Sequence, residues 1–242
     1  MIRTLLVYAV IVLFILMLGP PLLLWSALTR DTDILYSVGL FAAKAALYLA
    51  GVRIEVQHRE KIPVGKAVVY MPNHQSNCDP PAVAAVLPPV LIMAKQEFFR
   101  VPILGAGMRI RGFIPVDRSN RERSFVAVEQ AVAALKAGQS FLAFPEGTRS
   151  RTGRLQPFKK GVFVMAIKAG VPVVPISVSG ANKIMRPGDF KIYPGTVRIT
   201  IHDPVATAKC NITDRAKIAA QVREAIMDGL LPEEKPLVAD GA

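Results

Sequence analysis

Cysteine is scarce in this sequence, whose 242 residues include only two, Cys78 and Cys210. Two cysteines do not make a disulfide framework, and their scarcity indicates a reducing compartment. Acidic residues are also few, since 18 Asp and Glu stand against 30 Lys and Arg and leave a net charge of +12 at pH 7. Such a surplus predicts an anionic partner: nucleic acid, a membrane surface or a phosphorylated substrate.

Several functional motifs are missing as well. The chain has no Gly-x-Ser-x-Gly run and no Walker loop, which argues against a serine esterase and a P-loop nucleotide-binding protein. Its three histidines, His58, His74 and His202, lack metal-ligand spacing, so we expect neither a metal nor a cofactor. Aromatic residues make up 7% of the chain and lie mostly in apolar runs, which do not form a base-stacking surface. We therefore expect no nucleic-acid partner.

Apolar residues are abundant, at 52% of the chain, and they are concentrated at its beginning. Residues 4–28 are apolar almost throughout and are interrupted by Gly19-Pro20-Pro21. The run before this break is too short to cross a bilayer. Two interpretations stay open: a helix that enters the bilayer, turns at Gly-Pro-Pro and returns, or one kinked helix that spans it. Trp25 and Arg30 suit the membrane interface in either case.

A cleaved signal peptide fits the same stretch less well, because the apolar run exceeds a normal h-region and no Ala-x-Ala site follows. We therefore expect a membrane anchor at the N-terminus and an anionic membrane surface as a partner. Residues 33–49 extend this segment with the spacing of an amphipathic helix, which suits packing on the domain or lying among lipid headgroups.

The rest of the pattern is that of one α/β domain. From residue 51 short apolar runs alternate with segments of helical periodicity, with no repeat and no internal linker. We predict an α/β fold, a mixed sheet flanked by helices, over residues 51–230, preceded by the anchoring segment 1–50 and followed by a loose tail, 231–242. The predicted strands are 52–56, 67–70, 90–94, 112–118, 141–144, 171–178 and 197–201, and the later helices are 81–87, 98–108, 124–136, 161–169 and 213–230.

The polar turn of residues 71–80 lies between a buried strand and a short helix. It places His74 and Asp79 five positions apart. Neutral His74 is suited to take a proton from a hydroxyl, while Asp79 fixes the tautomer and stabilises the imidazolium. A simpler interpretation stays open, in which Asp79 caps the helix that Pro80 begins and His74 is a hydrogen-bonded turn residue.

Other polar side chains follow other predicted strands. Lys95 follows the strand 90–94, Arg118 ends the strand 112–118, and Glu146 to Arg149 follow the strand 141–144. Because ligands of open α/β sheets bind beyond the carboxyl ends of strands, this placement predicts one site for an anion beside a hydroxyl.

Arg149 is a good candidate for the anion, since an Arg fork suits a phosphate and the preceding Gly147 allows the backbone to approach it. Two alternatives stay open here, in which Arg118 only pairs with Asp117 and Glu146 only pairs with Arg149 at the surface.

Four motifs in this order resemble the four sequence blocks of glycerolipid acyltransferases, most closely the bacterial 1-acyl-sn-glycerol-3-phosphate acyltransferases. The blocks are Asn73–Asp79, Gly112–Arg118, Phe144–Ser150 and Val171–Pro175. The first and third together are highly specific, and the resemblance extends over roughly residues 50–205. In the second block Pro115-Val116 separates Phe-Ile from Asp-Arg, where the more familiar spelling keeps them close.

The resemblance implies transfer of a fatty acyl group from coenzyme A or acyl carrier protein to the sn-2 hydroxyl of lysophosphatidate, without an acyl-enzyme. It implies that His74 deprotonates this hydroxyl with Asp79 as its partner. It also makes Arg118 and Arg149 candidates for holding the phosphate, with Glu146, Gly147 and Thr148 in the same substrate-binding site. Lys95 is added only from its place at a strand end.

Other acceptors stay open: glycerol-3-phosphate, another lysophospholipid or a lyso-aminolipid. A basic membrane-binding protein without activity is a less favoured alternative. The expected location is the inner membrane, with the catalytic domain facing the cytoplasm.

Overall fold

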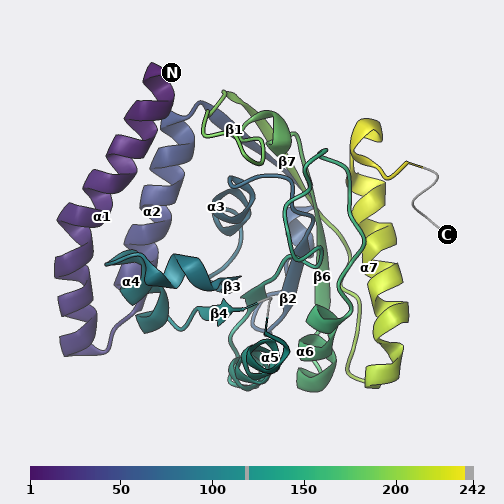
Figure 1. Ribbon diagram of the computed structural model, residues 1–242. Coiled ribbons are helices and arrows are strands. Elements are labelled where there is room, and N and C mark those ends of the chain that lie inside the picture. The colour runs from purple at the N-terminus through teal and green to yellow at the C-terminus, as the bar shows by residue number, and fades with distance from the viewer. Residues whose placement is uncertain (118–119, 238–242) are drawn as a thin grey trace.

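The sheet at the centre of the protein has seven strands in the order β1-β7-β6-β2-β5-β3-β4 (Figure 1). The computed structural model describes residues 1–117 and 120–237. β2 to β6 are parallel to one another, whereas β7 is antiparallel to β6 and β1 is parallel to β7. The predicted mixed sheet is therefore confirmed. The strands are β1 (Val52–Gln57), β2 (Val69–Pro72), β3 (Leu91–Lys95), β4 (Ile114–Val116), β5 (Phe141–Leu142), β6 (Val173–Ser179) and β7 (Gly195–Ile201).

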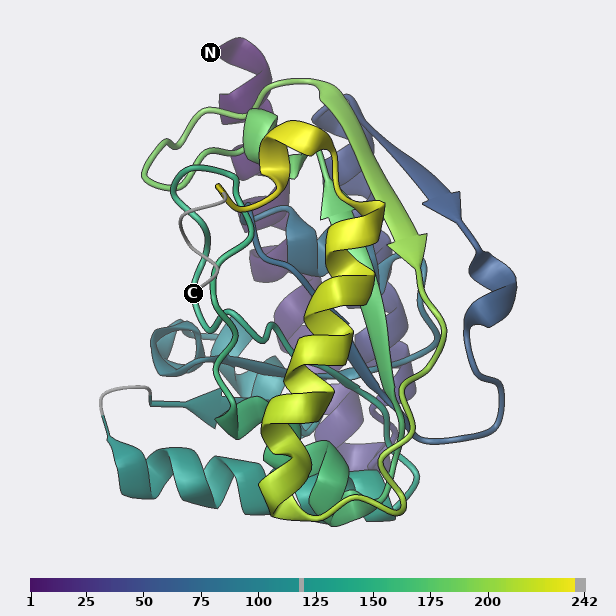
Figure 2. The same cartoon turned by 90° about the vertical axis from the view of Figure 1, so that its right-hand side faces the viewer.

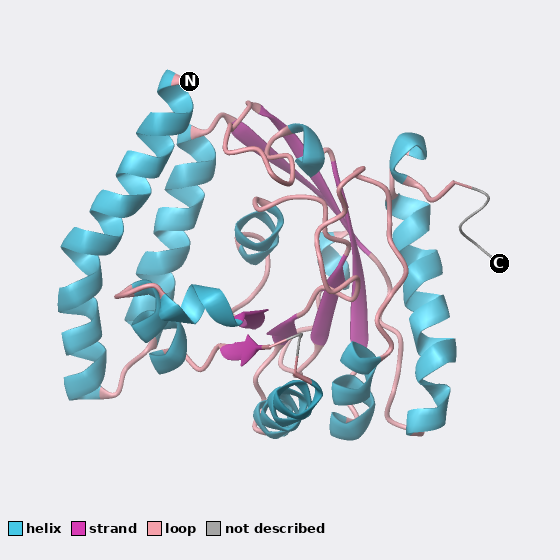
Figure 3. Ribbon diagram, in the orientation of Figure 1, coloured by secondary structure: helices cyan, strands magenta, loops and turns pink. Residues whose placement is uncertain are grey.

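Helices cover both faces of this sheet, as Figure 3 shows. The α-helices are α1 (Ile2–Thr29), α2 (Asp33–Leu49), α3 (Asp79–Ala84), α4 (Leu104–Ile110), α5 (Arg121–Lys136), α6 (Gly161–Ala169) and α7 (Arg215–Gly229). Short 3-10 turns are η1 (Arg59–Lys61), η2 (Gln96–Arg100), η3 (Ala181–Lys183), η4 (Ile212–Asp214) and η5 (Pro232–Glu234). Residues of α1, α2 and α3 share one core with the sheet, and residues of α5, α6 and α7 share the other. Figure 2 shows α7 lying along the sheet.

The alternation of side chains along β2 explains why two separate cores form. Val68 and Tyr70 pack in the core beneath α2 and α3, whereas Val69 and Met71 pack in the core beneath α5 to α7. All four side chains are fully or almost fully buried. Successive side chains of a strand point to opposite faces, so a continuous apolar run is what a strand covered on both faces requires.

The N-terminal segment is a pair of helices that turns at residues 30–32. Of the two interpretations left open, the one with a turn at Gly19-Pro20-Pro21 is therefore wrong. Helix α1 continues through both prolines. Proline removes a backbone donor, but an apolar helix is tolerant of this loss because the remaining backbone groups have no better partner than one another. By length and hydropathy α1 is long enough to cross a membrane, and little of its apolar stretch is buried.

Helix α1 also touches the α/β domain at widely separated points (Figure 1). Near its start, the Thr4 hydroxyl accepts a hydrogen bond from Ile192 N at 3.1 Å, and Tyr8 Oη donates to Phe190 O at 3.1 Å. Farther along, Gly19 lies so close to Ile103 that a Cβ there would overlap its side chain. The helix therefore lies along the domain rather than projecting from it.

Most predicted elements are present, with shorter or shifted ends. The predicted helix 98–108 is divided into η2 and α4, because Pro102 cannot donate to a helical hydrogen bond and disfavours a helical conformation at Val101. Helix α5 begins three residues before the predicted start, since the side chain of Asn120 accepts a hydrogen bond from Arg123 N and caps it.

The C-terminal segment from residue 231 to 236 is packed against the domain, so the expectation of a loose tail is wrong for these residues. Glu234 is 2% exposed, and its Oε1 accepts a hydrogen bond from Gly180 N at 2.8 Å. Its carbonyl accepts from Leu155 N at 2.9 Å, and the carbonyl of Lys235 accepts from Arg154 Nη1 at 2.8 Å. These contacts connect sequence-distant loops, which is why local composition does not reveal them.

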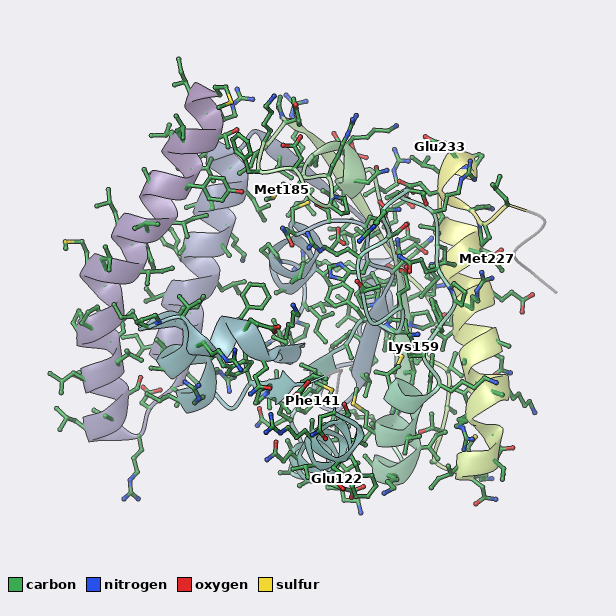
Figure 4. All side chains as sticks on the ribbon, in the orientation of Figure 1. Glu122, Phe141, Lys159, Met185, Met227 and Glu233 are labelled. Carbon is green, nitrogen blue, oxygen red and sulfur yellow. The ribbon has the colours of Figure 1, made fainter. Side chains whose placement is uncertain are left out.

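We expect Glu234→Ala to destabilise the protein, because it removes a buried acceptor from Gly180 N. A hydrogen bond to a charged group contributes about 1.5–3 kcal/mol, so Tm should fall by roughly 3–12 °C in a chain of this size. Thermal unfolding followed by circular dichroism in detergent measures the change. The control is Glu233→Ala, since Glu233 is exposed beside the end of α7 (Figure 4) and forms only a surface ion pair with Lys183. Equal changes in Tm would contradict this role of Glu234.

Candidate active site

The turn between β2 and α3 is held at its start by Asn73. Its amide donates to Val178 O at 2.8 Å and accepts from Val178 N at 2.7 Å. Because β6 is the neighbour of β2, the side chain of Asn73 replaces the backbone pairing that ends at Pro72. The next residue, His74, therefore leaves the sheet at a fixed point.

His74 and Asp79 are in direct contact, with Nδ1 of the imidazole 2.8 Å from Oδ2 of the carboxylate. The same oxygen accepts hydrogen bonds from Gln75 N at 2.6 Å and Ser76 N at 2.7 Å. Since an ionised carboxylate only accepts hydrogen bonds, Nδ1 carries the proton and Nε2 keeps a free lone pair. This is the tautomer that a general base requires.

The helix-cap interpretation of Asp79 is wrong. Asp79 is the first residue of α3 rather than the residue before it, and Cys78 occupies the N-cap position. The Asp79 carboxylate, which is fully buried, binds the turn that precedes the helix. Its position is therefore explained by the turn and by His74.

The imidazole of His74 is also fixed by a ring on its face. Phe144, which follows β5, stacks on it with ring centroids 4.1 Å apart and an interplanar angle of 27°. The His74 side chain keeps 14% of its surface exposed. The ring is thus held in one orientation while part of it stays accessible to a substrate.

Glu146 is a second buried carboxylate and is 1% exposed. Its Oε1 accepts a hydrogen bond from His74 N at 2.6 Å, and its Oε2 accepts from Gln156 N at 3.1 Å. Burial raises the pKa of Glu146 to about 8, although these two hydrogen bonds act to lower it and the charge of Asp79 raises it further. The alternative of a surface ion pair between Glu146 and Arg149 is wrong, because both carboxylate oxygens are bound to backbone N–H groups inside the protein.

Arg149 lies on the loop that follows Glu146. This loop turns at Gly147, whose φ of +74° belongs to the left-handed region, and Ser150 N donates to His74 O at 2.8 Å. The structure therefore joins the loop of Arg149 directly to the turn of His74. Thr148 is exposed and Arg149 is half-buried, and neither side chain has a hydrogen bond or ion pair with any residue that the structure describes. Among the described residues the guanidinium therefore has no counter-charge.

The carboxyl ends of β2, β5, β3 and β4 share one edge of the sheet, as the parallel pairing requires. His74 and Glu146 follow the adjacent strands β2 and β5, which brings them together. Lys95 is one strand farther away on β3 and pairs with Glu97 at 2.9 Å, both side chains being more than half exposed. Arg118 lies outside the described residues, and the neighbouring Asp117 pairs with Arg123 at 3.1 Å.

Sequence reasoning missed a contact between Gln75 and Gly153 that supports the turn of His74. Gln75 is 1% exposed, and its Nε2 donates to Gly153 O at 3.0 Å. A Cβ at Gly153 would overlap the amide of Asn182, and its φ of +79° also favours glycine. The only local signal for this contact was the glycine itself.

The site shows no arrangement that suggests a metal. Within residues 1–117 and 120–237 there is no group of three or more His, Cys, Asp or Glu side chains placed to hold a metal ion. The nearby thiol of Cys78 is buried, and burial together with the charge of Asp79 raises its pKa to about 12. A thiol with such a pKa stays protonated and is a poor nucleophile.

A model of the acyltransferase family matches residues 53–179, which carry β1 to β6 and the turn of His74. The chain belongs to the acyltransferase family. It is 37% identical to the chloroplastic 1-acyl-sn-glycerol-3-phosphate acyltransferase LPAT1 of Arabidopsis thaliana. The alignment covers 172 residues, 69% of this chain and 48% of that protein. It is 36% identical to the chloroplastic 1-acyl-sn-glycerol-3-phosphate acyltransferase BAT2 of Brassica napus. That alignment covers 162 residues, 66% of this chain and 47% of that protein.

This acyltransferase-family chain thus spans about half the length of these curated relatives. Among solved structures it is similar to the 1-acyl-sn-glycerophosphate acyltransferase PlsC of Thermotoga maritima, with a TM-score of 0.81 and 29% identity. That similarity covers 94% of this chain and 93% of the other. The fold of nearly the whole chain is therefore shared with PlsC.

We expect the stability of the protein to depend on pH through Glu146. In the unfolded chain this carboxyl loses its proton near its ordinary value of 4.5, whereas the folded chain keeps it until about pH 8. The folded state then binds more protons between these values, so the free energy of unfolding falls as pH rises through this window. Glu146→Gln cannot ionise and should flatten the decline in Tm between pH 5 and pH 8. If Tm falls equally with pH in the native protein and in Glu146→Gln, the pH dependence does not come from Glu146.

Proposed function

We propose that this protein is a 1-acyl-sn-glycerol-3-phosphate acyltransferase. It would transfer a fatty acyl group from the thioester of coenzyme A or acyl carrier protein to the sn-2 hydroxyl of lysophosphatidate, which gives phosphatidate. The observation that carries this proposal is the His74–Asp79 pair, joined to the loop of Arg149. Among the described residues neither Nε2 of His74 nor the Arg149 guanidinium has a partner. The names of the plant relatives and of PlsC support the same acceptor.

The reaction begins when Nε2 of His74 takes the proton of the acceptor hydroxyl as its oxygen attacks the thioester carbonyl. Asp79 stabilises the imidazolium that forms, since its carboxylate contacts Nδ1. The tetrahedral intermediate then expels the thiolate, which takes the proton back from Nε2 and leaves as a thiol. Because the thiol of Cys78 is protonated and 3% exposed, direct transfer without an acyl-enzyme is the better mechanism.

Arg149 is our first choice for the acceptor phosphate. It has no protein partner among the described residues and it belongs to the loop that Ser150 attaches to His74. We assign Arg118 as a second ligand of the phosphate. The backbone of Gly147 and the hydroxyl of Thr148 would belong to the same substrate-binding site. Lys95 is the weakest of the proposed binding residues because Glu97 already neutralises it. Glu146 would act indirectly, by fixing the backbone of His74.

We further propose that α1 lies in one leaflet rather than spanning the bilayer. Thr4, Tyr8 and Gly19 contact the α/β domain at positions spread along α1. If α1 spanned the bilayer, the charged domain beside it would lie in the hydrocarbon core, which is costly. Attachment to one leaflet avoids this cost and leaves the outward apolar side chains of α1 among lipids. The net charge of +12 and two free cysteines favour the cytoplasmic face of the inner membrane.

We expect His74→Ala to reduce kcat by about 10²–10⁴-fold, because it removes the general base. Asp79→Asn should lower kcat by at least about tenfold, since a neutral amide does not stabilise the imidazolium. An acyl-transfer assay at saturating substrates, with circular dichroism to confirm folding, measures both effects. His58→Ala is the control, because His58 is an exposed histidine paired only with Glu60. Near-normal turnover of folded His74→Ala would exclude this mechanism.

Arg149→Ala should raise the KM for lysophosphatidate, with a loss of roughly 10- to 150-fold in kcat/KM from the missing charged hydrogen bonds. Arg149→Lys should restore only part, because an ammonium does not form the bidentate contact. The assay uses acyl carrier protein as donor, because the phosphates of coenzyme A could also bind Arg149. Arg151→Ala is the control for the loss of one positive charge on the same loop. If an acceptor without phosphate is acylated as well as lysophosphatidate, both before and after mutation, lysophosphatidate is not the specific acceptor. The proposed chemistry of His74 and Asp79 would still stand.

A further inference from the structure

The loop of residues 186–193, which joins η3 to β7, exposes two aromatic side chains. Phe190 is 55% exposed and Tyr193 is 43% exposed. Between them Ile192 is 8% exposed and packs in the core shared with α1. Single exposed apolar residues are ordinary, whereas exposed apolar side chains that lie near one another are typical of interaction sites. We call these residues the aromatic loop.

The aromatic loop is closed by hydrogen bonds of its own. Tyr193 N donates to Ile184 O at 3.0 Å, Asp189 N donates to Arg186 O at 3.0 Å, and Lys191 N donates to Asp189 Oδ1 at 2.9 Å. The exposure of Phe190 is therefore a property of a defined turn, in which the backbone has its own partners.

Helix α1 is hydrogen-bonded to this loop although nearly the whole chain lies between them. Thr4, a polar residue 2% exposed near the start of an apolar helix, bonds to the backbone of Ile192. Tyr8 bonds to the carbonyl of Phe190. The exposed Ile2 and Leu5 of α1 are close in sequence to Thr4. Helix α1 and the aromatic loop are thus adjacent, joined through Thr4 and Tyr8.

The charges of this region favour an anionic partner. Arg186 and Lys191 are exposed, and neither is in an ion pair with the residues that the structure describes. Arg3 adds a third cation, since its Nη1 lies beside Gly51 and Pro194 at the end of the loop. The one acid of the loop, Asp189, already accepts from Lys191 N. Aromatic rings next to cations are typical of segments that lie at the headgroup level of an anionic bilayer.

We propose that the aromatic loop is a second membrane contact, with Phe190 and Tyr193 at the interface of the leaflet that holds α1. This inference rests on the proposed attachment of α1 to one leaflet. A single helix lying in a leaflet leaves the domain free to rotate about the helix axis. A second contact to one side of that axis removes this freedom and fixes how the catalytic edge faces the lipids.

The single tryptophan of the chain allows a direct test. In the full-length double variant Trp25→Phe/Phe190→Trp, the only indole reports on the loop. We expect its fluorescence to shift to the blue on vesicles of phosphatidylethanolamine and phosphatidylglycerol, and to be quenched when the acyl chains are brominated. The matched control is Trp25→Phe/Val64→Trp, because Val64 is 91% exposed. It belongs to the connection between η1 and β2, which lies at the right in Figure 2, whereas the loop before β7 lies at the upper left.

The native Trp25 in α1 separates failure of this inference from failure of the proposed attachment. Quenching of Trp25 without quenching at position 190 would overturn the loop contact and leave the attachment of α1 standing. No quenching at either position would overturn both. Equal quenching at positions 64 and 190 would also overturn the loop contact. It would show that the domain enters the bilayer without a preferred orientation.

A kinetic measurement tests whether the contact serves the reaction. Phe190→Ala/Tyr193→Ala should raise the apparent KM for lysophosphatidate in vesicles about tenfold, since burial of a large apolar side chain is lost. The KM for a short-chain lysophosphatidate that is monomeric in water should not change. An equal loss on both acceptors would indicate a purely structural loop and would contradict the proposal.

Discussion

The site depends on one oxygen atom, Oδ2 of Asp79. A buried carboxylate is costly unless hydrogen bonds compensate for its lost hydration, and here Oδ2 accepts from two backbone N–H groups and an imidazole, whereas Oδ1 has no partner among the described residues. The backbone bonds determine the shape of the turn, and the third bond determines the tautomer of His74. The fold of the turn and the chemistry of its histidine therefore have the same physical cause.

A second carboxylate repeats this arrangement from the neighbouring strand. Glu146 follows β5, accepts from His74 N and accepts from Gln156 N. Together with Asp79 it binds three consecutive backbone N–H groups, those of residues 74, 75 and 76. Because β2 and β5 are parallel neighbours, two motifs far apart in the sequence meet at one sheet edge. The loop that presents Arg149 begins at the same place.

The helix that we assign to the membrane, α1, is connected through α2 to the elements that carry these residues. Ala46 and Leu47 of α2 share a core with Ala82 and Val83 of α3, the helix that Asp79 begins. Helix α1 packs on α2, and Figure 1 shows α3 between this helical pair and the sheet. A short path of packed side chains therefore joins the helix that we propose lies in the membrane to Asp79, the carboxylate that contacts our proposed general base, His74.

The sequence by itself determined the α/β class, the strand-end positions of the polar motifs and the pairing of His74 with Asp79, because these depend on local periodicity and spacing. Only the tertiary structure decided what Glu146 binds, that α1 continues through Pro20 and Pro21, and that Glu234 is buried. The positions of both glutamates depend on a partner far away in the chain, which is His74 N for Glu146 and Gly180 N for Glu234. Local pattern records which face of a segment is apolar, whereas the partner of a buried polar group is settled only when distant segments meet.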